Sequence, residues 1–243
     1  MVLQQGVVTT ETLELMRKLM NEKIFENYFL VGGTALALRL GHRKSIDIDM
    51  FTQYDIPVNE VQKYLSEKYH FMEEFKEKNT LKGDIAKIKI DLIKYDYPFL
   101  QPLEKTNDGI KIASTEDIIA MKLSVITDSG TRVKDFTDIA YLSRDFSFNQ
   151  MLEFYKTKYE GSNIFSVAKA LVYFDDIDFE NEPVELVDAK FDWKKVNQRL
   201  VDMVQNPNKK FDTFPIEKTV KQTISQKQQA QKKTSKKTKD LSR

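Results

Sequence analysis

The chain has 243 residues, of which 41% are hydrophobic, and it contains two histidines and no cysteine. This length and composition predict a globular protein with one large domain or two small ones. They exclude a disulfide framework, a thiolate zinc site and a cysteine nucleophile, so any bound metal must be held by oxygen.

Neither a membrane span nor a secretory signal is expected. The apolar runs are far shorter than the ~18 to 20 residues that a membrane-spanning helix needs. Residues 1–15 lack the basic start, apolar stretch and small-residue cleavage site of a secretory signal. We therefore expect a cytoplasmic protein with no membrane segment.

The first predicted elements are a helix, a short strand and a second helix. Apolar residues recur at helical spacing over 10–25 after a threonine cap. A compact β-type run over 28–31 stops at the double glycine 32–33. The following helix is expected to begin at Thr34 and to end at Gly41.

Two longer strands carry acidic residues on their polar faces. Residues 45–51 alternate strictly, with Ile46, Ile48 and Met50 on one face and Asp47, Asp49 and Phe51 on the other. A helix is expected over 57–69. The segment 84–95 repeats the alternation as a second long strand, and it places Asp91 on the polar face.

Beyond about residue 112 the pattern becomes helical. Ser114 and Asp117 resemble a capping box at the start of one helix. Further helices are expected over 131–143, 147–158, 163–174 and 193–204, with an acidic, proline-containing loop at 175–188. The predicted fold class is α+β, in which a mixed sheet flanked by helices over 1–112 precedes a helical bundle domain over 113–215.

Residues 216–243 are predicted to form a basic, flexible tail. Residues 218–243 hold nine of the 38 Lys and Arg residues but one of the 37 acids, so the remaining chain has an excess of seven acids. The tail has too few apolar residues to offset its ordering entropy. Such an arm attracts RNA through counterion release or simply aids solubility, and the sequence leaves both interpretations open.

The carboxylates at positions 47 and 49 indicate a metal site. Side chains at i and i+2 of a strand share one face and stand about 6 to 7 Å apart. Hard divalent cations take carboxylate oxygens and relieve their repulsion. Asp91 becomes a third ligand if the two strands are neighbours. An isolated Asp-x-Asp is usually an exposed strand face, but the order of strand, glycine turn, helix, Asp-x-Asp strand and further Asp favours two-metal phosphoryl chemistry.

Several other residues are candidates for contacts with phosphate. Gly32, Gly33 and Thr34 combine close backbone approach with a helix N-terminus, which favours anions. Arg43 is able to grip phosphate in a bidentate manner. Lys122 lies in an apolar helical stripe, where it either snorkels to solvent or points into a cleft.

The next helix carries a second basic and acidic set. Lys134 and Asp138 are spaced i and i+4, which is typical of a surface ion pair worth a few tenths of a kcal/mol.

The segment LVGGTALALRLGHRKSIDIDMF resembles the signature of the AbiEii/AbiGii-type nucleotidyltransferases, a polymerase-beta-like family of bacterial abortive-infection and toxin–antitoxin systems. The resemblance continues through IDLIKY, STEDIIAMKLSVI, KDFTDIAYL and ALVYFDDID, and covers roughly residues 10–205. It departs from the usual pattern at Lys134, where the family commonly has arginine before the first acid of its helical motif.

The resemblance implies an NTP-dependent, pyrophosphate-releasing nucleotidyltransferase domain over 1–112. Its implied roles are catalysis by Asp47, Asp49, Asp91 and Lys122, with the three aspartates as ligands of Mg²⁺ or alternatively Mn²⁺. Nucleotide binding is implied for Gly32, Gly33, Thr34, Arg43, Lys134 and Asp138. RNA, notably tRNA, is the expected acceptor, and an antitoxin is the expected partner. A non-enzymatic nucleotide- or RNA-binding protein and a small-molecule nucleotidyltransferase of the antibiotic-modifying kind remain the alternatives.

Overall fold

The computed structural model describes residues 3–181 and 183–218. The helices of this part are α1 (Thr10–Met20), α2 (Gly32–Leu40), α3 (Val58–Tyr69), α4 (Thr115–Asp128), α5 (Val133–Leu142), α6 (Phe148–Lys158), α7 (Ile164–Leu171) and α8 (Trp193–Gln205), with a short 3₁₀ helix, η1 (Lys23–Phe25). The strands are β1 (Phe29–Leu30), β2 (Ile48–Thr52), β3 (Met72–Glu77), β4 (Thr80–Ile85), β5 (Ile88–Lys94), β6 (Glu104–Lys105) and β7 (Lys111–Ile112).

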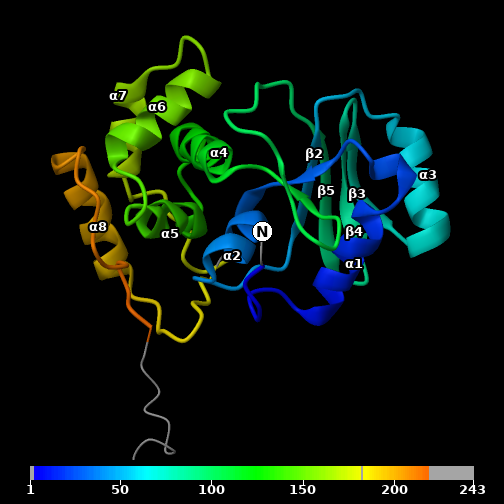
Figure 1. The fold of residues 1–243 in the computed structure, drawn as a ribbon, viewed down its shortest axis with the longest axis horizontal. Coiled ribbons are helices and arrows are strands. Elements are labelled where there is room, and N and C mark those ends of the chain that lie inside the picture. Colours follow the sequence, from blue (N-terminus) through cyan, green and yellow to red (C-terminus); the bar gives the residue numbers. More distant parts are fainter. Residues whose placement is uncertain (1–2, 182, 219–243) are drawn as a thin grey trace, which may run out of the picture.

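The strands form one mixed sheet in the order β3-β4-β5-β2-β1-β7-β6. The pairs β2–β5 and β1–β7 are parallel, and the other pairs are antiparallel. Figure 1 shows this sheet with α1 and α3 in one half of the molecule and α4 to α8 in the other, and α2 lies between them. The predicted mixed sheet flanked by helices is therefore confirmed.

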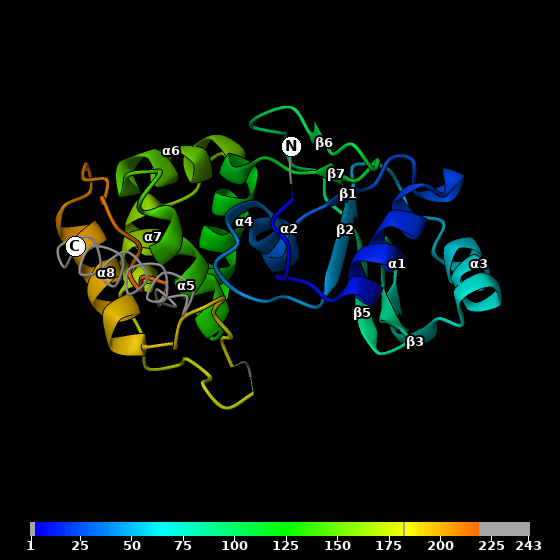
Figure 2. The ribbon, with the colours of Figure 1, turned by 60° about the horizontal axis from the view of Figure 1, so that its bottom comes forward.

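One face of the sheet belongs to the core and the other carries polar residues. The core face includes the fully buried Ile48, Met50, Ile90 and Leu92. Side chains alternate along a strand, so Asp49 on β2 and Asp91 on β5 point to the opposite face. That opposite face meets the helical half of the molecule, which Figure 2 shows from a second direction.

Helices α4 to α8 pack mainly on one another. α4 contacts α5, α6 and α7, while α8 contacts α5 and α7. α2 also packs against α4 and α5, so the helical half is joined directly to the sheet half. The predicted helices at 57–69 and after residue 112 are present with bounds shifted by a few residues, and Ser114 caps α4 by accepting from the backbone N–H of Asp117.

Two predicted boundaries are wrong. The strand expected over 45–51 begins at Ile48, and Ile46 is 58% exposed instead of buried. Residues 44 and 45 leave the sheet because their backbone N–H groups donate to Glu185 and Val7. α2 begins at Gly32 rather than at Thr34, although it does end at Gly41 in the left-handed conformation.

The segment 84–95 is a hairpin rather than one strand. It contains the end of β4, a turn and β5. The turn residues Ala86 and Lys87 both have positive φ, of 52° and 69°, as a tight hairpin turn requires. Neither residue is a glycine or an asparagine, the residue types by which such a turn is usually predicted, so the sequence did not indicate the turn.

No helix in residues 3–181 and 183–218 is both long enough and apolar enough to cross a membrane.

Candidate active site

Asp49 and Asp91 lie opposite each other at the centre of the sheet. The parallel pairing of β2 with β5 puts these two residues in direct register. Asp47 comes two residues before Asp49, just outside β2. All three carboxylates line a cavity of about 300 Å³. The structure thus brings together the three residues that the sequence suggested as metal ligands, and their role as ligands stays a prediction.

The cavity lies between the polar face of the sheet and the helical half of the molecule. Its walls come from the turn before α2, from β2, β4 and β5, and from α4 and the start of α5. Its lining includes Gly32, Gly33, Arg43, Asp47, Asp49, Lys82, Asp91, Lys122, Arg132, Lys134 and Asp135. A volume of this size is at the lower end of the range for small-molecule sites.

Gly32 and Gly33 make room for two side chains of the site. Gly32 has a φ of +70°, and a Cβ at this position would collide with Oδ2 of Asp49. A Cβ on Gly33 would collide with Nη2 of Arg43. The two glycines also form the first turn of α2, whose N-terminus favours anions. Because the two glycines have no side chain, Asp49 and Arg43 can pack against them, and phosphate is predicted to approach their backbone.

Thr34 lies behind the site rather than in it. Its side chain is fully buried and is absent from the cavity lining. Its hydroxyl donates to the backbone oxygen of Asp47 at 2.5 Å and lies 2.9 Å from Oγ of Ser45. The side chain of Thr34 thus fixes the backbone of the acidic segment, and the part of Thr34 in a phosphate-binding turn stays a prediction.

The electrostatics of Asp49 fit a divalent cation. Burial raises the pKa of Asp49 to about 7, and repulsion from Asp91 and Asp47 acts in the same direction. A hard cation bound by carboxylate oxygens would remove this repulsion. The chemistry of the three donors therefore suits a hard divalent cation.

Lys82 neutralises Asp91 in the structure. The pairing of β4 with β5 sets the two residues opposite each other, and Nζ of Lys82 lies 2.8 Å from Oδ2 of Asp91. Within residues 3–181 and 183–218, no three acidic or histidine side chains form a ready-made metal cluster.

Asp138 is the centre of a buried ionic network. Nε and Nη2 of Arg43 donate to its two oxygens at 2.7 and 2.8 Å. Nε2 of His42 donates to Oδ1 at 2.7 Å, and Nζ of Lys122 lies 2.6 Å from Oδ2. Burial by itself would raise the pKa of Asp138, but the charges of Arg43 and Lys122 hold it well below 3.8. The network fixes two cationic residues of the cavity wall.

The predicted surface pair of Lys134 with Asp138 is wrong in one respect, because Asp138 has no exposed surface. Lys122 does not snorkel to solvent but lines the cavity, as the second sequence interpretation expected. Its ammonium group binds Oδ1 of Asp135 at 2.6 Å as well as Asp138. The two acids keep the pKa of Lys122 above its ordinary value although burial opposes this shift.

Lys82, Arg132 and Asp135 also line the cavity, and sequence reasoning did not select them. Arg132 lies just before α5, two residues from Lys134, so its nearness to a predicted position was an available signal. Lys82 had none, because its place beside Asp91 depends on the register of β4 with β5.

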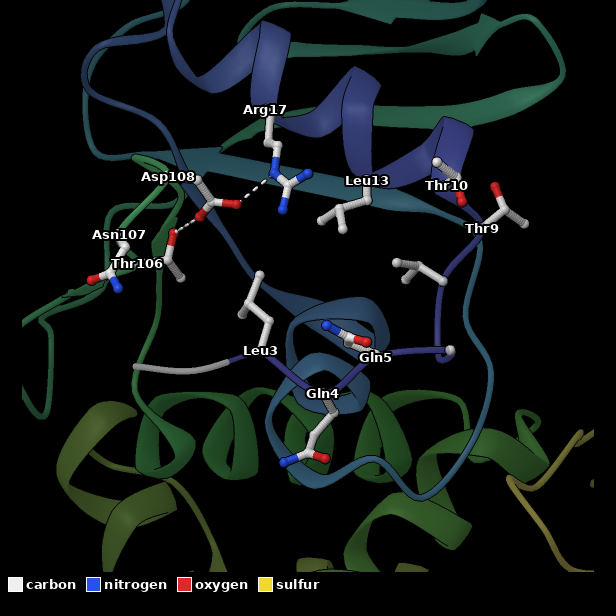
Figure 3. Close-up of a pocket in the computed structure, with 12 residues that line it drawn as sticks. Leu3, Gln4, Gln5, Thr9, Thr10, Leu13, Arg17, Thr106, Asn107 and Asp108 are labelled. Carbon is white, nitrogen blue, oxygen red and sulfur yellow. Dashed lines mark hydrogen bonds and ion pairs between the residues drawn. The ribbon is translucent and has the colours of Figure 1, made fainter.

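A larger cavity of about 710 Å³ lies elsewhere, between residues 3–10, α1 and the turn that joins β6 to β7. Figure 3 shows Arg17 of α1 reaching Asp108 of this turn, with Nε of Arg17 at 2.5 Å from Oδ2. Its lining has one acid paired with one base and no group of carboxylates. We therefore place the reactive site in the smaller cavity.

Two solved structures have folds similar to that of this chain. MenT4, the nucleotidyltransferase toxin Rv2826c from Mycobacterium tuberculosis H37Rv, has a TM-score of 0.55 and 12% identity, covering 79% of this chain and 81% of that one. JHP933 from Helicobacter pylori has a TM-score of 0.52 and 18% identity, covering 83% of this chain and 93% of that one. These likenesses define a nucleotidyltransferase-like fold.

Sequence comparison identifies the family. The family model described as the nucleotidyl transferase AbiEii toxin of type IV toxin–antitoxin systems matches residues 14–101 and 75–217. The chain belongs to this family of nucleotidyltransferases, which confirms the resemblance and the enzyme class inferred from the sequence. An uncharacterised protein of Aquifex aeolicus (strain VF5) is 34% identical over 171 residues, which are 68% of this chain and 82% of that protein.

Proposed function

We propose that the protein transfers a nucleoside monophosphate from an NTP to a hydroxyl group of RNA, with tRNA as the first acceptor to test. In this reaction the acceptor oxygen bonds to the α-phosphorus, the bond to pyrophosphate breaks, and the hydroxyl proton is released to solvent. The observation that carries the proposal is the direct register of Asp49 with Asp91 in a cavity that several lysine and arginine side chains also line.

The donor triphosphate is assigned to the side of the cavity formed by Gly32, Gly33 and α5. The first turn of α2 presents backbone N–H groups there. Arg43, Lys122 and Lys134 line the same cavity and offset phosphate charge. Asp138 takes part indirectly, because it holds Arg43 and Lys122 in position.

Asp47, Asp49 and Asp91 are the proposed ligands of the divalent cation, for which Mg²⁺ is the first choice and Mn²⁺ the alternative. When bound, such cations neutralise phosphate charge and favour the deprotonated acceptor hydroxyl. Asp91 lies on the side away from the glycine turn, so we assign the acceptor to that side.

The test compares the wild type with Asp49→Asn. Each protein is incubated with Mg²⁺, each α-labelled NTP in turn and total bacterial RNA, and RNA is then separated from protein. We expect label in RNA with the wild type and none with the variant, whose folding is checked by circular dichroism. Removal of the cation by EDTA should abolish transfer, and addition of Mg²⁺ should restore it.

Other outcomes distinguish the alternatives. Transfer retained by Asp49→Asn would refute the assignment of the site. Intact NTP that is bound but never transferred would favour a non-enzymatic nucleotide- or RNA-binding protein. Transfer to a small aminoglycoside-like molecule but not to RNA would favour the antibiotic-modifying kind.

The family assignment also supports a cellular role as the toxin of a toxin–antitoxin pair. Expression of the wild type should then arrest growth, and the Asp49→Ala variant should not. Arrest that persists with the variant would place the toxicity outside this site. An antitoxin encoded alongside would be the partner that suppresses arrest.

The proposal keeps the predicted division into a nucleotidyltransferase domain at 1–112 and a helical bundle domain at 113–215, with the cavity between them. A cytoplasmic location follows from an RNA acceptor. The predicted basic tail at 216–243 lies almost entirely outside the described residues, and deletion of 219–243 tests whether it adds salt-dependent RNA affinity.

A further inference from the structure

The polar face of the sheet, which carries Asp49 and Asp91 and is called the carboxylate face below, continues to the free edge of the sheet at β3. Asp49 on β2 is in register with Asp91 on β5, Asp91 with Lys82 on β4, and Lys82 with Phe75 on β3. Residues directly opposite on neighbouring strands share a face. These four side chains therefore form one row across four strands, from the reactive site to the outermost strand.

The outer part of this face is open. All six residues of β3 are exposed, and Phe75 and Met72 retain 46% and 65% of their surface. The other face of the same hairpin is covered, since Leu81 and Ile85 are buried and α3 packs there. Phe75 is therefore an open aromatic ring on the edge strand, in the same row as Lys82 and Asp91, and this placement suggests a binding role.

The direction of the reaction indicates what this face binds. This step rests on the proposed function, in which the triphosphate occupies the glycine turn and the cationic wall. An acceptor for in-line displacement must then approach from the opposite side, past Asp91. The surface next to Asp91 on that side is Lys82, followed by Phe75.

We propose that the row from Lys82 to Phe75 binds the single-stranded 3′ end of the RNA acceptor. Neighbouring strands lie about 4.8 Å apart, so Phe75 stands two spacings, or about 10 Å, from Asp91. That distance places the ring beside nucleotides that precede the reacting one. An unpaired base stacks on Phe75, and Lys82, whose side chain is 39% exposed, turns from Asp91 to a phosphate.

Stacking supplies most of the affinity in this proposal. Lys89 lies on the same face and adds a second cation, but Asp84 and Glu77 share the face through their pairing with Lys89 and Thr80. Because the face carries both acids and lysines, it would not attract every polyanion by charge alone. It suits a single RNA strand that is held by an aromatic ring and one or two lysines.

The test measures RNA binding and NTP binding separately on the full chain. A short fluorescent single-stranded RNA is titrated with the wild type, Phe75→Ala and Lys82→Ala in Mg²⁺, and NTP affinity is measured by calorimetry. Phe75→Ala should weaken RNA binding about 5- to 150-fold and leave NTP affinity unchanged. Lys82→Ala should reduce the slope of log affinity against log salt by about 0.7.

Two variants serve as matched controls. Phe165→Ala removes an aromatic ring that is 75% exposed on α7. Lys63→Ala removes a lysine that is 74% exposed on α3. Neither residue belongs to the carboxylate face, and both variants should bind RNA as the wild type does.

The outcomes separate this inference from the function on which it rests. Unchanged RNA affinity and acceptor KM in Phe75→Ala, with transfer intact, would overturn the inference alone. An equal loss in Phe165→Ala would overturn it too, as would a blunt RNA duplex that binds as tightly as the single strand. Labelling of a protein instead of RNA would assign the face to a protein acceptor, whereas a wild type without any transfer would refute the proposed function itself.

Discussion

Gly32 is the residue on which the position of Asp49 depends most directly. Its φ of +70° and its contact with the carboxylate exclude any side chain. Gly32→Ala would cost about 1–2 kcal/mol of backbone strain and would displace Asp49. We expect cation-dependent NTP affinity to fall about 10- to 100-fold, as when the support of a metal ligand is lost. Calorimetry with NTP and Mg²⁺, together with chemical denaturation, measures both effects.

Gly161→Ala separates strain from displacement. Gly161 has a similar φ of +78°, and nothing lies within 4 Å of the Cβ that would be added. This variant should lose a comparable amount of stability and keep its NTP affinity. An equal loss of NTP affinity in the two variants would contradict the role assigned to Gly32.

His42 makes stability depend on pH. Burial lowers the pKa of His42 from its ordinary 6.5, and the opposing hydrogen bond from its ring to Asp138 does not compensate. Below pH 6.5 the unfolded chain therefore binds a proton that the folded protein does not. The free energy of unfolding should fall by about 1.4 kcal/mol per pH unit from this group until the lowered pKa is reached.

His42→Gln removes the titration and keeps an amide donor for Asp138. Above pH 6.5 the variant and the wild type should respond to pH in the same way. Below it, urea denaturation should show the wild type losing stability faster than the variant. Parallel profiles down to pH 5 would show that His42 is charged in the folded state.

At the scale of elements, the sequence predicted the strands and helices whose apolar residues recur at a regular spacing. The alternation around Asp49 and Asp91 marks half-buried strands, and the spacing after Ser114 marks helices, because each pattern reflects one face turned to the core. The start of β2 was misplaced because Ile46 continues the alternation. Hydrogen bonds from the preceding residues to Glu185 and Val7, far away in sequence, decide that boundary.

The residues of the site also fall into those that local sequence patterns predict and those that they do not. Asp47, Asp49 and Asp91 were available from motif order, whereas the position of Lys82 depends on strand register and that of Phe75 on a strand that was not predicted. The buried role of Asp138 was also hidden. Spacing on one helix cannot show that Arg43, 95 residues earlier, reaches it with two hydrogen bonds.

An ion pair between Lys158 and Asp117 joins three elements. Both side chains are 1% exposed, and Nζ of Lys158 lies 2.6 Å from Oδ1 of Asp117. Asp117 of α4 also accepts from the backbone N–H of Leu100, and Nζ of Lys158 donates to the carbonyl of Pro98. The pair thus ties the segment after β5 to α4 and α6. Lys158→Met should destabilise the protein by about 3–5 kcal/mol, because it leaves the buried carboxylate of Asp117 without its counter-charge.

The double variant Asp117→Asn/Lys158→Met also removes the buried negative charge of Asp117. It should recover much of the lost stability. Denaturant unfolding of the wild type, Lys158→Met, Asp117→Asn and the double variant gives the coupling energy. Additive losses in the double variant would mean that the lysine contributes through packing rather than through its charge.

At the scale of the whole molecule, the buried network makes one unit of the two halves. His42 and Arg43 follow α2, while Lys122 and Asp138 lie on α4 and α5, so the bonds around Asp138 cross between the sheet half and the helical half. The proposed domains at 1–112 and 113–215 therefore share part of their core. A cleft built in this way holds its walls in fixed relation, which suits in-line transfer between two bound substrates.

This shared core predicts a single unfolding transition. Trp193, the one tryptophan of the chain, packs against Phe136, Phe174 and Phe179 and reports on the helical half. Circular dichroism at 222 nm also records α1 and α3 beside the sheet. In urea the two signals should change at the same midpoint, although a chain of this length often unfolds in steps. Asp138→Asn should lower both midpoints together, whereas a tryptophan transition that precedes the dichroism change would show that the halves unfold independently.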